Sequence, residues 1–357
     1  MEIGWRQCLE WASGRRALPL LGVDLSPTAV RVIELSSAGD RWRVEHYSRR
    51  VLPHGAIRDG NIVHSAPVSQ ALIEALAECR TPVRRAALAL PPGLVIRKIL
   101  SVPDDLSDEE LESQVEADAQ DNLPFSLDEL RLDFAAIGPS VGEAGKTDVM
   151  LVAARREKID ERLALVEAAG LYPVAVDVES QALLSAIGLH DWGSADKHTA
   201  PAGRFAEPSA ARSDYALLQL GRDSSQFSLI RRGLQVFERE LSAGLHKLEQ
   251  EISRRPQQAA ASCDAFHDMV CQEIQRAFQL HASAADPVEA NTLLLAGPVD
   301  KLPMLPALLS DRLQLAVQLA NPFSAMDCAD TVNESLLQAD ASSCLVACGL
   351  AMLRAPS

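Results

Sequence analysis

Hydrophobic positions at the start of the chain come in short runs that are separated by turn residues. The runs cover residues 20–25, 30–35 and 42–47, and they are broken by residues 26–28 and 38–40. Runs of this length that are rich in Val, Ile and Leu and bounded by Gly, Pro, Ser and Asp predict β-strands. We therefore expect the fold to open with three consecutive antiparallel strands.

After this meander, strand-like runs alternate with segments of helical period. Ser107 and Glu110 have the S-x-x-E spacing of a capping box, which predicts a helix that stops near Pro124. A mixture of strands and helices favours the α/β class. The pattern predicts helices over residues 68–79, 157–169 and 179–187, and strands over residues 86–90, 95–102, 130–137, 148–154 and 173–178.

The second half of the chain repeats the opening pattern. A strand, a polar turn and a strand span residues 217–230, and Gln219 falls 195 positions after Asp24, so that this segment overlays residues 23–32. The repeat predicts two lobes of related topology that face a shared cleft. We expect the rest of the second lobe to contain a strand over 234–237, helices over 245–253 and 259–281, and a strand over 292–295.

Composition changes this interpretation little. The chain has 357 residues, of which 47% are hydrophobic and 23% charged, as in ordinary globular proteins of about two domains. The formal net charge of −15 disfavours nucleic acid as a partner. Seven cysteines without a C-x-x-C pair favour reduced thiols over a disulfide framework or a zinc site. Apolar stretches are too short to cross a bilayer.

Negative charge is concentrated in one stretch. Residues 104–133 contain twelve acidic residues against Arg131 alone, a net charge of −11. Two interpretations stay open: a solvated helix face, or a surface that attracts a basic partner. Residues 1–19 are expected to be a flexible leader, with a segment that touches a membrane as the alternative.

Nearly the whole chain, from Leu21 to Met352, resembles the PilM family of type IV pilus assembly proteins, which are relatives of the cell-division protein FtsA. The most specific matches are an acidic helix, a proline turn and a strand over residues 106–134. Further matches lie at residues 152–155, 169–171, 176–179, 320–323 and 347–351. The resemblance implies an α/β, two-lobed actin-like (ribonuclease-H-like duplicated) fold with an inserted small α/β subdomain of FtsA type.

The same resemblance implies the domain organisation. Lobe I would be interrupted by the inserted subdomain and completed by the C-terminal helix. The expected parts are a flexible leader at 1–19, the lobe I core at 20–85, the inserted subdomain at 86–170, the lobe I return at 171–190, a linker at 191–213, lobe II at 214–330 and a C-terminal helix returning to lobe I at 331–357.

A nucleotide site is also implied, because tight turns in this fold offer backbone N–H groups to phosphates. The resemblance places ATP and Mg²⁺ at that site, with Asp24 as the metal-site residue. No catalytic residue is singled out, and Asp177 and Glu179 are expected to be structural. The implied cofactor-binding residues are Asp24, Ser26, Thr28, Arg31, Gly221 and Gly297.

Four positions depart from the family's nucleotide motifs. Ser26 replaces a glycine, and Arg31 replaces a lysine by a planar cation. Gln219 stands where a carboxylate is expected and therefore weakens Mg²⁺ capture. Pro298 replaces the second glycine of the adenosine turn and removes an N–H donor. These changes weaken ATP binding, and we expect at most a weak ATPase.

The resemblance finally implies a function. It points to a cytoplasmic scaffold of the type IV pilus machine, which drives twitching motility, at the inner face of the inner membrane. The scaffold would bind the N-terminal cytoplasmic tail of a PilN-like protein, contact other platform proteins and reach the membrane only through its partners. Two alternatives remain: an active ATPase or small-molecule kinase of the same fold, or an FtsA-like filament. An FtsA-like protein ends in a basic amphipathic helix, whereas this chain ends at residues 354–357 with Arg-Ala-Pro-Ser.

Overall fold

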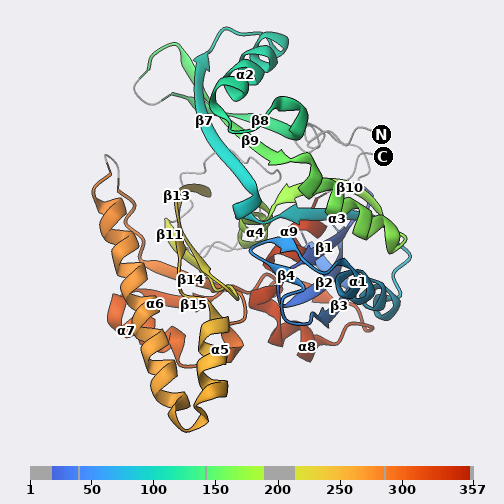
Figure 1. Ribbon diagram of the computed structural model, residues 1–357, viewed down its shortest axis with the longest axis vertical. Helices are drawn as coiled ribbons and strands as arrows, with labels where there is room; N and C mark the ends of the chain where they lie inside the picture. The colour runs from blue at the N-terminus through green and yellow to red at the C-terminus, as the bar shows by residue number, and fades with distance from the viewer. Residues whose placement is uncertain (1–17, 39–40, 141–142, 189–213, 285–286, 354–357) are drawn as a thin grey trace.

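The computed structural model describes most of the chain in two lobes and a projecting subdomain (Figure 1). The expected linker at 191–213 and all but the last two residues of the expected leader lie outside the described residues. The described ranges are 18–38, 41–140, 143–188, 214–284 and 287–353.

Lobe I is built on a six-stranded sheet with the order β10-β6-β1-β2-β3-β16. The first three strands form the expected antiparallel meander, and β1, β6 and β10 run parallel to one another. The strands are β1 (Leu21–Leu25), β2 (Ala29–Ala38), β3 (Arg41–Val51), β6 (Arg85–Leu90), β10 (Tyr172–Val178) and β16 (Asp327–Cys328).

Lobe II repeats this topology in a five-stranded sheet with the order β13-β12-β11-β14-β15. Its first three strands are again antiparallel, and β14 and β15 add in parallel beside β11. The predicted duplication is therefore confirmed. The strands are β11 (Tyr215–Gln219), β12 (Ser225–Arg231), β13 (Leu234–Leu241), β14 (Thr292–Ala296) and β15 (Ala316–Leu319).

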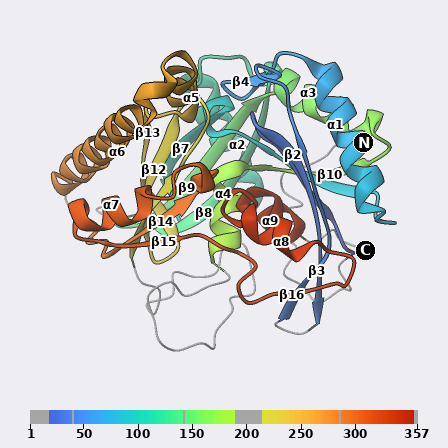
Figure 2. The same ribbon diagram turned by 90° about the horizontal axis from the view of Figure 1, so that it is seen from below.

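Helices cover both sheets. Figure 2 shows α4 and α9 between the two sheets, where residues of both lobes form one shared apolar core. The outer faces have separate cores, under α1 and α3 in lobe I and under α5, α6 and α7 in lobe II. The helices are α1 (Ser65–Cys79), α3 (Arg156–Ala168), α4 (Glu179–Ile187), α5 (Leu245–Arg254), α6 (Ala259–Ala282), α7 (Leu305–Leu313), α8 (Glu334–Ala339) and α9 (Leu345–Ala351).

Helix α9 approaches its neighbours so closely that two glycines are needed. A Cβ added at Gly22 of β1 would lie 1.9 Å from the carbonyl oxygen of Ala347 and 2.7 Å from the nitrogen of Ala351. A Cβ added at Gly349 would lie 1.8 Å from the carbonyl oxygen of Ala182 in α4. Backbone atoms cannot move aside as a side chain can, so α9 is locked between the lobe I sheet and α4.

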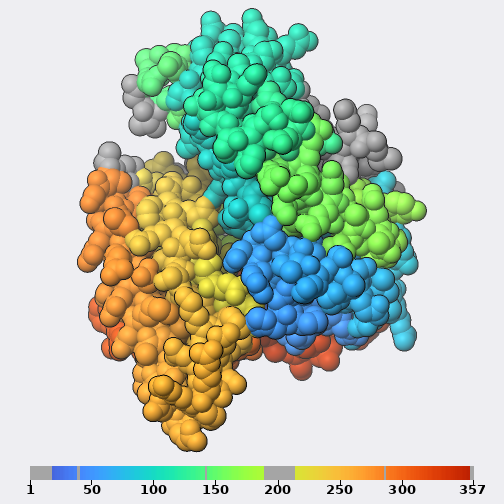
Figure 3. All heavy atoms as spheres, viewed as in Figure 1, coloured from blue at the N-terminus to red at the C-terminus, as the bar shows by residue number. Residues whose placement is uncertain are grey.

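The inserted subdomain has its own sheet and core. Strands β7 (Val95–Pro103), β9 (Lys146–Arg155) and β8 (Leu130–Pro139) form an antiparallel sheet, and α2 (Asp108–Asn122) packs on one face of it. In Figures 1 and 3 this subdomain projects from the top of the molecule, away from the body of both lobes. Two short strands, β4 (Ile57–Arg58) and β5 (Asn61–Ile62), pair beside lobe I.

The strand pairing places the boundaries of the subdomain differently from the expected 86–170. Strand β6 pairs with β1, and α3 packs on α1 and β10, so both elements belong to lobe I. The insertion therefore begins after Leu90 and ends at Arg155. Likewise β16 lies within the expected lobe II range of 214–330, yet it pairs with β3 in the lobe I sheet.

Candidate functional site between the lobes

Asp24 and Arg31 lie directly opposite each other on β1 and β2, on the face of the sheet that is turned toward α9. Both are buried, with 5% and 4% of their surface exposed. Arg31 Nη1 lies 3.4 Å from Asp24 Oδ2 and donates a hydrogen bond of 3.1 Å to Ser26 Oγ. The first implied loop therefore brings three of its candidate residues together.

The turn between β1 and β2 is closed by its own hydrogen bonds. The backbone N–H and the hydroxyl of Ser26 both donate to the carbonyl oxygen of Ala29, at 3.1 and 2.8 Å. The carbonyl of Thr28 accepts the N–H of Leu52, and the Thr28 hydroxyl lies 3.4 Å from Ser26 Oγ. Ser26 thus uses its side chain to hold the turn, where a glycine would offer only backbone.

Asp340, at the end of α8, is the strongest partner of Arg31. It accepts hydrogen bonds from Arg31 Nε at 2.7 Å and Arg31 Nη2 at 3.2 Å, from the Tyr47 hydroxyl at 2.7 Å and from Arg49 Nη1 at 3.1 Å. Burial alone would raise the pKa of Asp340, but Arg31, Tyr47 and Arg49 hold that pKa below its usual value. Asp340 is therefore an anion at neutral pH, gripped by two arginines.

Gly221 and Gly297 meet at the ends of β11 and β14 in lobe II. Gly297 has a φ of +87°, and a Cβ there would lie 2.1 Å from the carbonyl oxygen of Leu220. A Cβ at Gly221 would lie 2.1 Å from the carbonyl oxygen of Ser224. Both glycines are required by close backbone packing, and Leu220, beside Gly221, contacts Gly297.

The segment after α8 connects the two sets of candidate residues. The N–H of Gly297 donates to the carbonyl of Ser342 at 2.7 Å, and the Ser342 hydroxyl donates back to the carbonyl of Gly297 at 2.7 Å. Ser342 lies in the short helix η6 (Ala341–Ser343), directly after Asp340. One short segment therefore bonds to Arg31 in lobe I and to Gly297 in lobe II.

A second carboxyl group lies close to Asp24. Burial raises the pKa of Asp24 to about 6, although Arg31 opposes the shift. Burial and the nearby charge of Asp24 raise the pKa of Glu179, at the start of α4, to about 8, with Arg162 opposing. Arg162 is buried in α3 and donates to the carbonyl of Gly60, while its Nε has no partner. At neutral pH Glu179 is therefore mostly protonated, whereas Asp24 is mostly ionised.

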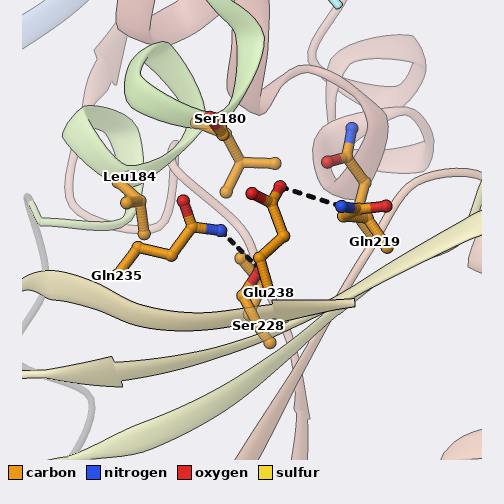
Figure 4. Close-up of a pocket in the computed structure, with 9 residues that line it drawn as sticks. Ser180, Leu184, Gln219, Ser228, Gln235 and Glu238 are labelled. Atoms are coloured by element: carbon orange, nitrogen blue, oxygen red, sulfur yellow. Dashed lines mark hydrogen bonds between the residues drawn. The ribbon is translucent and has the colours of Figure 1, made fainter. Parts of the chain in front are cut away.

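The gap between α4 and the lobe II sheet is small and polar. Figure 4 shows Ser180 and Leu184 of α4 facing Gln219, Gln235 and Glu238 of lobe II. The space between them has room for about one water molecule. This pocket is too small for a nucleotide.

Arg97 of β7 closes the gap from the side of the inserted subdomain. It forms an ion pair with Glu238 and donates to Gln235 Oε1 at 2.7 Å. Gln226 Nε2 also donates to Glu238, at 2.8 Å. The inserted subdomain is thereby tied to lobe II as well as to lobe I.

In this arrangement the implied residues do not fit a bound Mg-nucleotide. The fork of Arg31 is taken by Asp340, and the N–H groups of Gly221 and Gly297 donate to Ser225 Oγ and to the carbonyl of Ser342. Gln219 brings no charge for a metal. In the part of the chain that the structure describes, no group of three or more His, Cys, Asp or Glu side chains is placed to hold a metal ion. The binding roles of the predicted residues stay predictions.

Three side chains of this region are not among the site residues that the sequence predicts. Asp340 lies 309 positions from Arg31, and the one local signal was an acid next to an apolar helix. Glu179 was expected to be structural, but it lies near Asp24 because β1 and β10 are parallel and end at the same edge. Arg97 sits in a strand whose alternation gave no sign of a contact with lobe II.

The acidic stretch forms an exposed surface on the inserted subdomain. The capping box is present: Ser107 accepts from the N–H of Glu110, and Glu110 accepts from the N–H of Ser107. Nine acidic side chains on α2 and its flanks are exposed, and none of the nine forms an ion pair with a described residue. We call them the α2 acidic surface: Asp104, Asp105, Asp108, Glu109, Glu110, Glu116, Asp121, Asp128 and Glu129.

Comparison with known proteins identifies the family. A family model described as type IV pilus assembly protein PilM matches residues 22–261 and 256–355, which together are almost the whole chain. Among solved structures, the PilM-PilN type IV pilus biogenesis complex superimposes with a TM-score of 0.76 at 25% sequence identity. That match covers 94% of this chain and 98% of the other.

A more distant structure shares the fold. The ethanolamine utilization protein EutJ from Carboxydothermus hydrogenoformans superimposes with a TM-score of 0.52 at 12% identity, over 98% of this chain and 94% of the other. Together with the duplicated sheets, these matches show that the chain has the two-lobed actin-like fold. Among the described residues, no helix is long and apolar enough to cross a membrane.

Proposed function

The chain belongs to the PilM family of type IV pilus assembly proteins, and from that premise we propose that it is a cytoplasmic scaffold at the inner face of the inner membrane. In this role it binds the N-terminal cytoplasmic tail of a PilN-like inner-membrane protein. The similar structure with a TM-score of 0.76 is a complex of PilM with PilN, which supports a partner of this kind.

The α2 acidic surface is the observation that carries the proposal. Nine exposed carboxylates on a subdomain of about 65 residues create a negative field, and none of the nine forms an ion pair with a described residue. A short tail with Lys and Arg residues is attracted to such a field, which raises its association rate and orients it beside the subdomain. The projecting position in Figure 3 leaves this surface open to a partner.

The proposed scaffold does its work without nucleotide turnover. The residues implied for ATP and Mg²⁺ are engaged with one another, and the lobe II loop carries Gln219 in place of a carboxylate. An ATPase or a small-molecule kinase of this fold would need a charged metal ligand at that loop. Binding, and not catalysis, is therefore the activity that we assign to the chain.

A titration tests the proposal directly. The full chain is titrated with a synthetic peptide of the N-terminal tail of the PilN-like protein from the same genome, at low and at high salt. We expect binding that weakens as salt screens the charges. The double variant Glu109→Lys/Glu116→Lys should bind about tenfold more weakly at low salt, with a smaller salt dependence.

A matched variant separates local steering from net charge. Asp300→Lys/Asp311→Lys makes the same change in net charge on exposed positions of lobe II. This control should bind the peptide nearly as the unchanged chain does. No binding of the unchanged chain at either salt concentration contradicts the proposed partner, and equal losses in both double variants contradict the role of the α2 acidic surface.

A further inference from the structure

Arg31 is the cation that the resemblance assigns to a phosphate, yet all three nitrogens of its guanidinium already donate hydrogen bonds. Two of its nitrogens, Nε and Nη2, grip both oxygens of Asp340, and the third donates to Ser26 Oγ. A guanidinium fork has the same geometry for a carboxylate as for a phosphate. The fork of Arg31 therefore holds an anion that the chain itself supplies.

The surroundings of Asp340 are those of an anion site. Arg49 donates to Oδ1 at 3.1 Å, the Tyr47 hydroxyl donates to Oδ2 at 2.7 Å, and the Cys344 thiol lies 3.6 Å from Oδ2. These donors come from β3 and from the start of α9, whereas Arg31 comes from β2. Charge-assisted donors that converge from three elements on one buried carboxylate are the means by which proteins hold phosphates and sulfates.

The position of Asp340 in the chain completes the argument. The next residues form η6, and Ser342 in it takes the N–H of Gly297, the donor that the resemblance assigns to the adenosine side of the nucleotide. The same segment therefore occupies a phosphate-side group in lobe I and an adenosine-side group in lobe II. It also lies between the two lobes, because it bonds to both.

We propose that Asp340 is an internal anion that replaces a nucleotide phosphate on Arg31. The segment 340–342 holds lobes I and II together in the way that a bound nucleotide would hold them. The closed arrangement of the lobes is consequently independent of ATP. The inference concerns this chain's own residues and does not depend on the proposed partner.

Thermal unfolding of the full chain tests the inference with three probes: formate, inorganic phosphate and Mg-ATP. The wild-type chain should show no change in Tm with any of them at constant ionic strength. Asp340→Gly removes the carboxylate and leaves a cavity lined by Arg31 and Arg49. Its Tm should be lower by about 5 °C or more, and formate or phosphate should restore part of the loss.

A matched control and a second variant make the outcome decisive. Asp330→Gly changes an exposed acid in the turn before α8, and its Tm should stay at the wild-type value and should not respond to formate or phosphate. Asp340→Asn keeps the volume of the side chain but loses its charge, so its Tm should fall while formate has no room to act. If Asp340→Gly does not fold, the Tm of Asp340→Asn tests the inference in its place.

Two results would overturn the inference. If Mg-ATP raises the Tm of the wild-type chain as much as it raises the Tm of Asp340→Gly, nucleotide binds while Asp340 is in place. If Asp340→Asn has the same Tm as the wild-type chain, the carboxylate of Asp340 does not hold the lobes together. Rescue of Asp340→Gly by formate and phosphate, with wild type unchanged, supports the internal anion.

Discussion

The two lobes have the same strand order but differ in the chemistry of one equivalent pair. In lobe I, Asp24 on β1 lies opposite Arg31 on β2. In lobe II, 195 positions later, Gln219 on β11 lies opposite Gln226 on β12. The register of the two hairpins is conserved in the duplication, while a charged pair in one lobe corresponds to a neutral pair in the other.

In each lobe the second residue of the pair bonds to a carboxylate: Asp340, outside the sheet, in lobe I, and Glu238, on the neighbouring strand β13, in lobe II. Arg31 holds Asp340, which precedes α9, whereas Gln226 holds Glu238, which is paired with Arg97 of the inserted subdomain. The cation is part of the sheet in lobe I, and it comes from a neighbouring unit in lobe II. The strand topology places a polar residue at the same position in both lobes. The identity of that residue then determines which segment of the chain it contacts.

The largest difference between the lobes should appear when each pair is truncated. Arg31→Met leaves the buried carboxylates of Asp340 and Asp24 without their main cation, and it should lower the free energy of unfolding by about 4 kcal/mol. Gln226→Met removes one neutral donor and should cost about 1 kcal/mol. Urea denaturation measures both, and equal losses would break the proposed contrast.

A smaller effect is expected where α9 crosses lobe I. Gly22→Ala places a methyl group against the backbone of Ala347 and Ala351, and it should cost about 3 kcal/mol in the free energy of unfolding. The equivalent position in lobe II is Leu217, a buried residue of the shared core. Gly93→Ala is the control, because a Cβ at Gly93 meets no atom within 4 Å. Urea denaturation of this variant should show a change of at most about 0.5 kcal/mol in the free energy of unfolding. A neutral Gly22→Ala would mean that α9 is not locked against β1.

The smallest effect is a pH dependence that belongs to lobe I. The pKa of Glu179 is raised from 4.5 to about 8, so the folded chain holds a proton that the unfolded chain has lost. This contribution to stability is complete at low pH and is lost as the pH rises toward 8. Between about pH 6 and pH 8 the free energy of unfolding should fall by at most about 1 kcal/mol per pH unit, and Glu179→Gln should flatten the slope.

The pH range from about 6 to 8 and a control variant, Glu249→Gln, separate the contribution of Glu179 from those of other carboxyl groups. Asp24 has a pKa of about 6, so most of its contribution is already lost at the start of the window. Glu249 in lobe II has a pKa held below 4.5 by Lys301 and Arg222 in spite of partial burial, so Glu249→Gln should leave the slope unchanged. Urea denaturation across the pH range measures the slope. A slope that survives in Glu179→Gln would assign it to another group.

Much of the fold follows from local pattern. The opening meander, the capping box at Ser107 and α4 were predicted from runs, turns and helical period, because these features depend on residues within a few positions of one another. The boundaries of the insertion were less accurate. Whether β6 belongs to lobe I depends on its pairing with β1, about 65 positions earlier, which local pattern does not contain.

The candidate site was predictable in its turns and not in its contacts. Asp24, Ser26 and Arg31 are close in sequence, so a hairpin brings them together. Asp340 reaches Arg31 only because the chain returns from lobe II to lobe I at its end. No local pattern in either segment predicts this contact, and a single sequence contains no covarying pair that could reveal it.

The chain enters and leaves the inserted subdomain at one place, because its first strand, β7, pairs with its last strand, β9. Val95 at the start of β7 pairs with Ala154 at the end of β9, so the chain departs from and rejoins lobe I side by side. A module attached in this way can be exchanged or reshaped in evolution with little change to the body that carries it. Relatives can therefore diverge in the partners they recruit while the duplicated body stays the same.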